Sequence, residues 1–148
     1  MVKVHSIEMI EHSARSTPNV TAHADMPNGA LVGIDYLNKV TTAPATSKEL
    51  FVVMNVQTGD DEYATAKTIN QGEYANLFNL TEWAGKELDV TAENITDEMS
   101  AVTVGNTLTF DATTFKFKKG TVTSGVKFTV TAKGGTGVPY VTVLIEVV

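Results

Sequence analysis

Apolar and polar residues alternate over most of the second half of the chain. In residues 107–117, Leu108 and Phe110 alternate with threonines, and the aromatic positions then change parity at Phe115. A period of two is typical of a half-buried strand, and a change of parity indicates a turn or bulge. The pattern therefore predicts two strands joined by a turn at residues 111–113.

Two more strands are predicted toward the end of the sequence. Residues 121–132 alternate again with a break at a serine–glycine pair, and residues 134–137 form a glycine-rich turn. Residues 138–148 are almost continuously apolar. Such a run is typical of a strand buried on both faces, and the alternative is a strand that pairs in an oligomer.

The first half of the chain is less regular but also indicates strands. Residues 29–34 follow a proline–asparagine turn signal and contain a glycine, which indicates a close backbone approach or a bulge. The strongly apolar residues 50–57 predict a buried strand, and a glycine–aspartate turn would join it to residues 62–69 as a hairpin. Residues 86–92 predict another short strand with alternate apolar positions on one face.

One segment has helical spacing. In residues 72–83, Tyr74, Leu77 and Phe78 fall three and four positions apart, which predicts one or two helical turns. An irregular aromatic loop is the alternative. Residues 6–15 are a second, weaker helix candidate, because isolated helices of that length are marginal in water.

These elements predict a mainly β protein. About seven to nine short strands with a turn signal roughly every ten residues are typical of a single antiparallel β-sandwich or small β-barrel domain. One short helix and an N-terminal arm complete the prediction. Residues 1–28 are assigned to the arm, or extended segment, because much of this stretch is polar, and residues 29–148 to the β-rich domain.

Composition narrows the class of protein. The 148 residues are 43% hydrophobic and 19% charged, which favours a packed core over disorder. The net charge of -6 argues against a general nucleic-acid binder. With no cysteine, disulfides, thiolate metal sites and cysteine nucleophiles are excluded. Charged residues interrupt every apolar run, so we expect no signal peptide, no transmembrane helix and no membrane partner.

Candidate chemistry is sparse. His5, His12 and His23 lie among acidic residues, and Glu8 has the helical spacing to His12 that can chelate zinc. A solvated polar arm explains the same residues better, because a structural zinc site needs four closely held ligands and nothing in this segment indicates a rigid structure. Acidic pairs lie at turn signals, and no G-x-S-x-G nucleophile motif is present. We therefore expect no cofactor and no metal, and not an enzyme.

The aromatic residues allow two interpretations. Tyr74, Phe78 and Trp83 could form an exposed platform for a sugar or peptide. They could instead lie in the core, which we favour because a small β-domain needs its few large side chains there.

Several stretches resemble capsid decoration proteins of tailed bacteriophages, also called cement or auxiliary head proteins. They are E-L-D-V-T-A-E-N-I at residues 87–95, V-T-V-G-N-T-L-T-F-D-A-T-T-F-K-F at 102–117, G-A-L-V-G-I-D-Y-L at 29–37 and L-F-V-V-M-N-V at 50–56. The likeness is one of pattern from residue 29 onward. It implies a non-enzymatic virion structural protein on the capsid exterior, made in the host bacterial cytoplasm, with the major capsid protein as partner.

Attachment is expected through the arm, and a homo-oligomer through the last strand. An extended arm can add a strand to a neighbour or place apolar side chains in its pockets. The candidate interface residues are Val2, Val4, Ile7, Met9, Ile10, Val143 and Ile145. The alternative function is a carbohydrate- or receptor-binding β-module, such as a head fibre, tail adhesin or surface domain, which an exposed Trp83 would favour.

Overall fold

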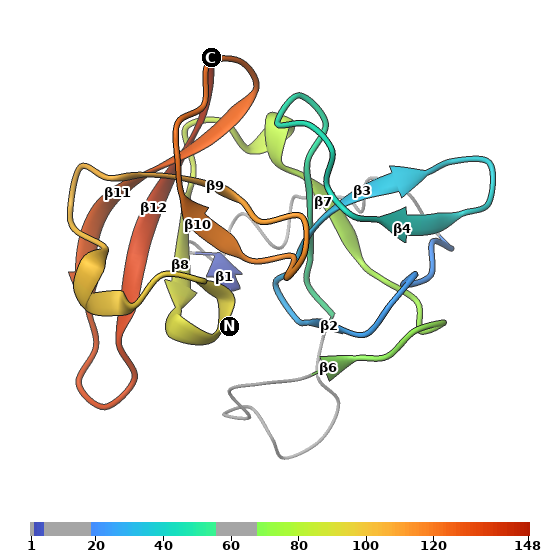
Figure 1. The fold of residues 1–148 in the computed structure, drawn as a ribbon, viewed down its shortest axis with the longest axis horizontal. Helices are drawn as coiled ribbons and strands as arrows, with labels where there is room; N and C mark the ends of the chain where they lie inside the picture. Colours follow the sequence, from blue (N-terminus) through green and yellow to red (C-terminus); the bar gives the residue numbers. More distant parts are fainter. Residues whose placement is uncertain (1, 5–18, 56–67) are drawn as a thin grey trace.

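The computed structural model describes residues 2–4, 19–55 and 68–148, and these residues form an antiparallel β structure (Figure 1). Its strands are β1 (Val2–Val4), β2 (Met26–Pro27), β3 (Leu31–Asp35), β4 (Val40–Thr42), β5 (Phe51–Val53), β6 (Thr68–Ile69), β7 (Leu77–Asn79), β8 (Glu87–Thr91), β9 (Thr107–Phe110), β10 (Phe117–Lys119), β11 (Val126–Gly134) and β12 (Tyr140–Val147). Three short 3-10 helices are η1 (Leu80–Trp83), η2 (Ala92–Asn94) and η3 (Met99–Ala101). None of the described helices has the length and apolar character needed to cross a membrane.

The largest sheet has six strands in the order β1-β8-β12-β11-β9-β10 and curls into a half-barrel (Figure 1, left). β12 is an internal strand, paired on one edge with β8 and on the other with β11. Val143 and Ile145 are fully buried on its core face, and Thr142 is also buried on the opposite face. Burial on both faces therefore accounts for the middle of the apolar run, whereas Leu144 is half-buried and Val138, Val147 and Val148 are exposed.

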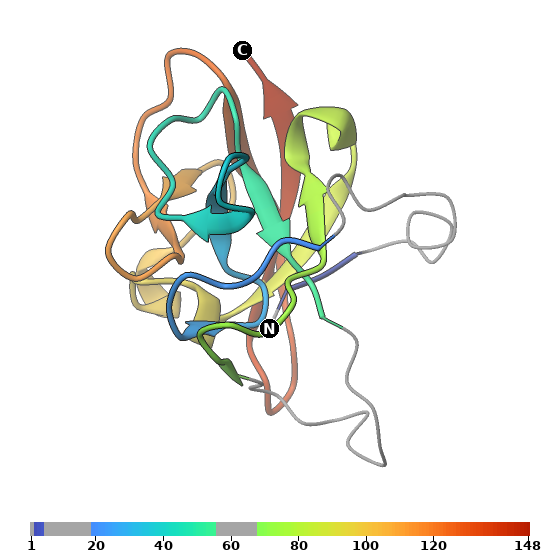
Figure 2. The ribbon, with the colours of Figure 1, turned by 90° about the vertical axis from the view of Figure 1, so that its right-hand side faces the viewer.

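A second sheet has the order β4-β3-β5-β7, and β2 pairs with β6 in a separate two-stranded sheet. The β3–β4 hairpin projects at the right of Figure 1 and therefore points toward the viewer in Figure 2. Where β3 passes β4, a Cβ on Gly33 would lie 2.7 Å from the Thr42 hydroxyl oxygen. The glycine within residues 29–34 thus makes room for a side chain, whereas a close backbone approach or a bulge was expected, and the nearest backbone atom, the Ala43 oxygen, would be 3.6 Å away.

Two hydrophobic clusters form the core, and the second sheet divides them. The first cluster contains Val52 of β5 together with Phe117 and Phe128, whose ring centroids lie 4.8 Å apart. The second cluster contains Phe51 and Val53 of the same strand. Because successive side chains of a strand point to opposite faces, β5 supplies both clusters, which is why its residues are uniformly apolar.

The turn between β9 and β10 connects the six-stranded sheet to the second sheet. The Asp111 carboxylate accepts hydrogen bonds from the backbone N–H groups of Thr113 and Thr114, at the turn predicted between two strands. Phe115 then adopts a positive φ of 61° and packs against the second cluster. Its carbonyl accepts a hydrogen bond from the Leu31 N–H at 2.8 Å. The β9–β10 connection is therefore a fixed link between the two sheets.

Asparagine side chains form a second link, which we call the asparagine bridge (Asn28, Asn55 and Asn94). The Asn28 side-chain amide forms two hydrogen bonds with the backbone of residue 55. It accepts from the N–H at 2.8 Å and donates to the carbonyl at 3.1 Å. Asn55 in turn accepts from the Asn76 N–H and donates to the Tyr74 carbonyl, both at 2.8 Å. The buried Asn94 donates to the Asn28 carbonyl at 3.0 Å. Side-chain amides here replace the ladder bonds of a sheet.

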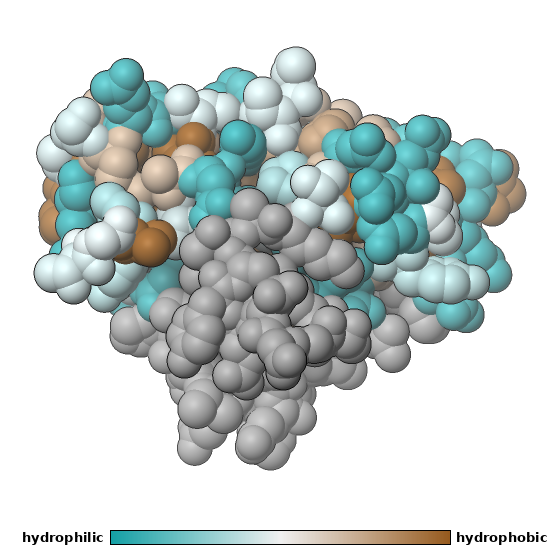
Figure 3. Space-filling view, turned by 90° about the horizontal axis from the view of Figure 1, so that it is seen from below, coloured by the Kyte–Doolittle hydropathy of each residue, from teal (hydrophilic) through white to brown (hydrophobic). Residues whose placement is uncertain are grey.

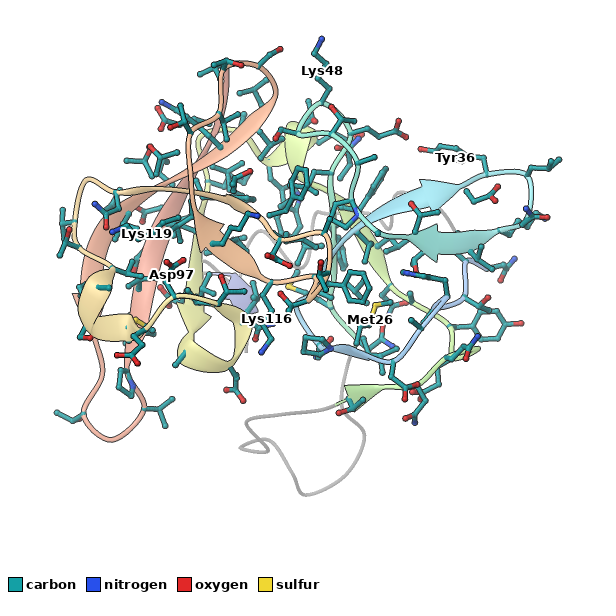
Figure 4. All side chains as sticks on the ribbon, in the orientation of Figure 1. Met26, Tyr36, Lys48, Asp97, Lys116 and Lys119 are labelled. Carbon is teal, nitrogen blue, oxygen red and sulfur yellow. The ribbon has the colours of Figure 1, made fainter. Side chains whose placement is uncertain are left out.

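The described strand edges are partly covered. The Asp97 carboxylate accepts from the Lys119 N–H at 2.7 Å, and the Phe117 carbonyl accepts from the Thr96 N–H at 2.8 Å, along the outer edge of β10 (Figure 4). Thr21 forms a bridge to Val40 along the outer edge of β4. Covered edges oppose uncontrolled strand addition between molecules.

One local prediction holds only in part, and a second is not met by the described residues. Residues 72–83 form no α-helix: Leu77 and Phe78 belong to β7, and only Leu80–Trp83 turns helically, as η1. Pairing of β7 with β5 overrides the local helical spacing. The hairpin of residues 50–57 with 62–69 is also not formed by the described residues, since β5 pairs with β3 and β7, and β6 with β2. A mainly β, antiparallel fold is confirmed, while a complete sandwich or barrel is not.

The segment assigned to an arm belongs to the fold wherever the structure describes it. β1 adds a strand to the six-stranded sheet, with Val2 opposite Val90 and Val4 opposite Leu88. Residues 19–28 also contribute side chains to the second cluster, including Met26, which is 2% exposed. Residues 5–18 lie outside the described part of the chain, as does the second helix candidate at residues 6–15.

Candidate functional site

Of the seven residues predicted as a partner interface, the structure describes the side chains of three, Val2, Val143 and Ile145. Val143 and Ile145 are fully buried and Val2 is 6% exposed, all three in the first hydrophobic cluster of their own chain. Val4 lies in β1, opposite a buried strand. Ile7, Met9 and Ile10 lie outside the described residues. The side chains of Val2, Val143 and Ile145 therefore serve internal packing.

The exposed aromatic platform, which was the alternative to core packing, is not formed. Trp83 is 4% exposed, and its ring centroid lies 5.2 Å from that of the half-buried Phe78, within the first cluster. Tyr74 is 69% exposed and forms a bridge with Thr21, in another part of the fold. The core interpretation thus holds for Trp83 and Phe78.

Metal chemistry has no support among the described residues. They contain no group of three or more histidine, aspartate or glutamate side chains that could hold a metal ion. His23 instead contacts Thr41 and Phe115. His5, His12 and Glu8 lie outside the described part of the chain.

The contact between His23 and Thr41 has the form of an activated nucleophile. The imidazole Nδ1 lies 2.7 Å from the Thr41 hydroxyl oxygen, and such a base can activate a hydroxyl. Thr41, however, has no exposed surface, and its oxygen also accepts from the His23 backbone N–H at 3.1 Å. No substrate can reach this hydroxyl, so the pair is structural.

The most exposed apolar side chain that the structure describes is at the tip of the β3–β4 hairpin. Leu37 is 90% exposed and the neighbouring Tyr36 is 57% exposed. In the view from below, the end of the molecule that carries this hairpin has a hydrophobic spot within a largely hydrophilic surface (Figure 3). Contiguous exposed apolar surface marks contact sites with other proteins, and Tyr36 and Leu37 are adjacent exposed apolar residues, so this tip is the candidate contact site.

Side-chain hydrogen bonds hold this tip in one conformation. One Asp35 carboxylate oxygen accepts from the backbone N–H groups of Leu37 and Asn38, both at 3.0 Å, and the other accepts from the Asn38 side-chain amide at 2.7 Å. These bonds, with that of the Asn38 side chain foremost, lower the pKa of Asp35 below its ordinary value. Lys39 completes the reversal with a positive φ of 54°. Leu37 is therefore presented by an ordered turn.

Tyr36 ties the hairpin to the segment before β5. Its hydroxyl donates to a Glu49 carboxylate oxygen at 2.7 Å, on the upper side of the hairpin in Figure 4. The bond to Glu49, with desolvation and the carboxylate charge, raises the pKa of Tyr36 to about 12. The sequence signals that could have revealed this tip are Asp35 and Asn38, three positions apart between two β-rich stretches.

Because the Tyr36 pKa is about 12, we expect its phenolate to form roughly two pH units later than an ordinary tyrosine. A raised folded-state pKa means that the stabilisation is present below about pH 10 and is lost as the pH rises toward 12. The difference in ultraviolet absorbance titration between wild type and Tyr36→Phe isolates this step. Glu49→Gln should move the step to lower pH, and an unchanged step in that variant would refute the assignment.

Comparison with known protein families, with curated proteins and with solved structures finds no match to this chain.

Proposed function

We propose that this protein is a non-enzymatic virion structural protein that binds the outside of a phage capsid as a decoration or cement protein. Its partner would be the major capsid protein, and it would act as a homo-oligomer on the capsid exterior. The observation that carries the proposal is the ordered hairpin that leaves Leu37 90% exposed at its tip. The resemblance in sequence pattern indicates that the binding partner would be a major capsid protein.

The hairpin suits a binding role because its conformation is fixed before contact. The Asp35 hydrogen bonds and the Tyr36–Glu49 bond restrict the turn in the free protein. Less conformational entropy is then lost on binding, so more of the contact energy of Leu37 contributes to affinity. This smaller entropy loss would favour tight attachment to a capsid shell.

The other function classes have less support. A carbohydrate-binding module would be favoured by an exposed Trp83, which is buried. A general nucleic-acid binder is opposed by the net charge of -6. For an enzyme, the described His23–Thr41 pair offers no accessible nucleophile.

Co-sedimentation with purified capsids that lack this protein tests the proposal. The wild-type chain should pellet with the capsids, and failure to do so would remove the decoration function. Leu37→Asn should weaken binding at least about tenfold, as expected for loss of a central apolar anchor. Val104→Asn is the matched control, because Val104 is also an exposed turn residue, 61% exposed, but lies away from the hairpin.

The two variants separate the function from the contact element. If wild type and Leu37→Asn bind equally well, the decoration function stands but the hairpin is not its contact. If Val104→Asn loses binding to the same extent as Leu37→Asn, the effect is not specific to the hairpin. Circular dichroism of each variant should be unchanged, because both side chains are largely exposed.

A further inference from the structure

Three segments that are distant in sequence meet at one imidazole. The His23 ring lies between Thr41 of β4 and Phe115 of the β9–β10 turn, with the two ring centroids 5.3 Å apart and the planes at 78°. The Phe115 carbonyl holds the Leu31 N–H at the start of β3. We call His23, Thr41 and Phe115 the histidine joint. It lies where the turn of the six-stranded sheet docks on the second sheet.

One protonation state of His23 pairs every hydrogen-bonding group of this joint. The Thr41 oxygen has no exposed surface and accepts from the His23 backbone N–H at 3.1 Å. Its single hydrogen then needs an acceptor, and the imidazole Nδ1, 2.7 Å away, is the one that the structure provides. The arrangement that pairs this hydrogen has the hydroxyl donating to an unprotonated Nδ1, and it corresponds to a neutral imidazole with its proton on Nε2.

We propose that the histidine joint is an acid-sensitive contact, which opens when His23 is protonated and releases the Phe115 turn from the second sheet. Protonation places a hydrogen on Nδ1, which faces the Thr41 hydroxyl. The hydroxyl can still accept that hydrogen, but its own proton then has no acceptor in a fully buried site. A buried donor without a partner is costly, so the ring is expected to move toward water.

The charged groups on the three segments do not offset this cost. On the second sheet, the Asp35 carboxylate is occupied at the hairpin tip, and Lys39 is itself cationic. On the turn, Asp111 is bonded to backbone N–H groups and to Lys118, and Lys116 is cationic.

On the segment of His23 itself, Asp25 accepts from the Gln71 N–H at 2.8 Å. No ion pair to His23 is found among the described residues. Desolvation by burial lowers the pKa of His23 below 6.5, in agreement with the neutral form that pairs the Thr41 hydrogen.

The direction of the effect follows from linkage. A histidine whose folded-state pKa lies below its unfolded value binds more protons when its site is open. The joint therefore has its full stability above about pH 6.5 and loses stability as the pH falls below that value. This behaviour is independent of the proposed capsid function, since it concerns a contact within one chain.

Amide hydrogen exchange of Leu31, read by NMR, tests the joint directly. Its N–H is bonded to the Phe115 carbonyl at 2.8 Å, so it reports release of the turn. After correction for intrinsic exchange, its protection should fall more than about threefold between about pH 7.5 and about pH 5. The Phe128 amide, in the middle of β11, is the internal control and should not change in parallel.

Two variants make the test specific to His23. His23→Asn keeps a side-chain oxygen as acceptor for the Thr41 hydroxyl but cannot titrate, so protection of Leu31 should become independent of pH. Thr41→Val removes the hydroxyl and should also abolish most of the pH dependence. Equal protection of wild-type Leu31 at both pH values would overturn the proposal. So would a pH dependence that persists in His23→Asn, because another group would then be responsible.

Discussion

Gly125→Ala is expected to lower the free energy of unfolding by about 3–5 kcal/mol, a large part of the stability of a small domain. Gly125 has a φ of +100°, which strains any other residue. A Cβ there would also lie 2.3 Å from the Ser47 carbonyl carbon. Since the Ser47 carbonyl accepts from the Val126 N–H at 2.7 Å, the loop cannot retreat without losing that bond.

Gly105→Ala is the matched control for this prediction. Gly105 has a similar φ of +89°, but a Cβ there would have no neighbour within 4 Å. This variant should therefore show only the backbone strain, about 1–2 kcal/mol. Thermal and chemical denaturation of both variants measures the difference. If the two variants lose the same stability, the close approach of the Ser47 loop to Gly125 is not a significant constraint.

Asn55→Ala should cost about 2–4 kcal/mol, because it removes both side-chain bonds of one member of the asparagine bridge. The Asn76 N–H and the Tyr74 carbonyl would each lose a partner at 2.8 Å. Denaturation in urea gives the change in free energy, and loss of protection at the Asn76 amide gives its location.

Asn55→Asp separates the two bonds. Its carboxylate keeps an acceptor for the Asn76 N–H but has no donor for the Tyr74 carbonyl, so about half of the loss is expected. Asn38→Ala is the control on an exposed turn, where the side chain donates a hydrogen bond to Asp35 of the same tip, and should cost less than about 1 kcal/mol. A loss at Asn38 as large as that at Asn55 would contradict the bridging role.

The local sequence pattern predicts a strand correctly where the strand has one clear apolar face. β8 was predicted from alternate apolar residues, of which Leu88 is fully buried, and the turn at Asp111 from a change of parity. It failed for Leu77 and Phe78, whose spacing fits a helix but whose neighbours are the residues of β5. Strand partners are chosen by the whole fold, so a short segment does not determine them.

The candidate contact surface was less predictable than the fold. Apolar residues such as Val143 and Ile145 were assigned to a partner, although they are buried in the chain itself. Sequence periodicity does not reveal Leu37, because a single leucine in a turn has no periodic pattern. Its exposure depends on the Asp35 hydrogen bonds and on the hairpin's position at one end of the molecule. The asparagine bridge joins residues 27 and 66 positions apart, which pattern analysis does not detect.

The position of β12 in the sheet determines when the sheet can form during synthesis. It is the last strand of the described chain, yet it lies between β8 and β11, which do not pair with each other. On the ribosome, those two strands have no common neighbour until residues 140–147 emerge. Val2 pairs with Val90, and Tyr140 pairs with Thr91. Folding is therefore expected to be slow and to occur after most of the chain has been made, as is usual when contacts are distant in sequence.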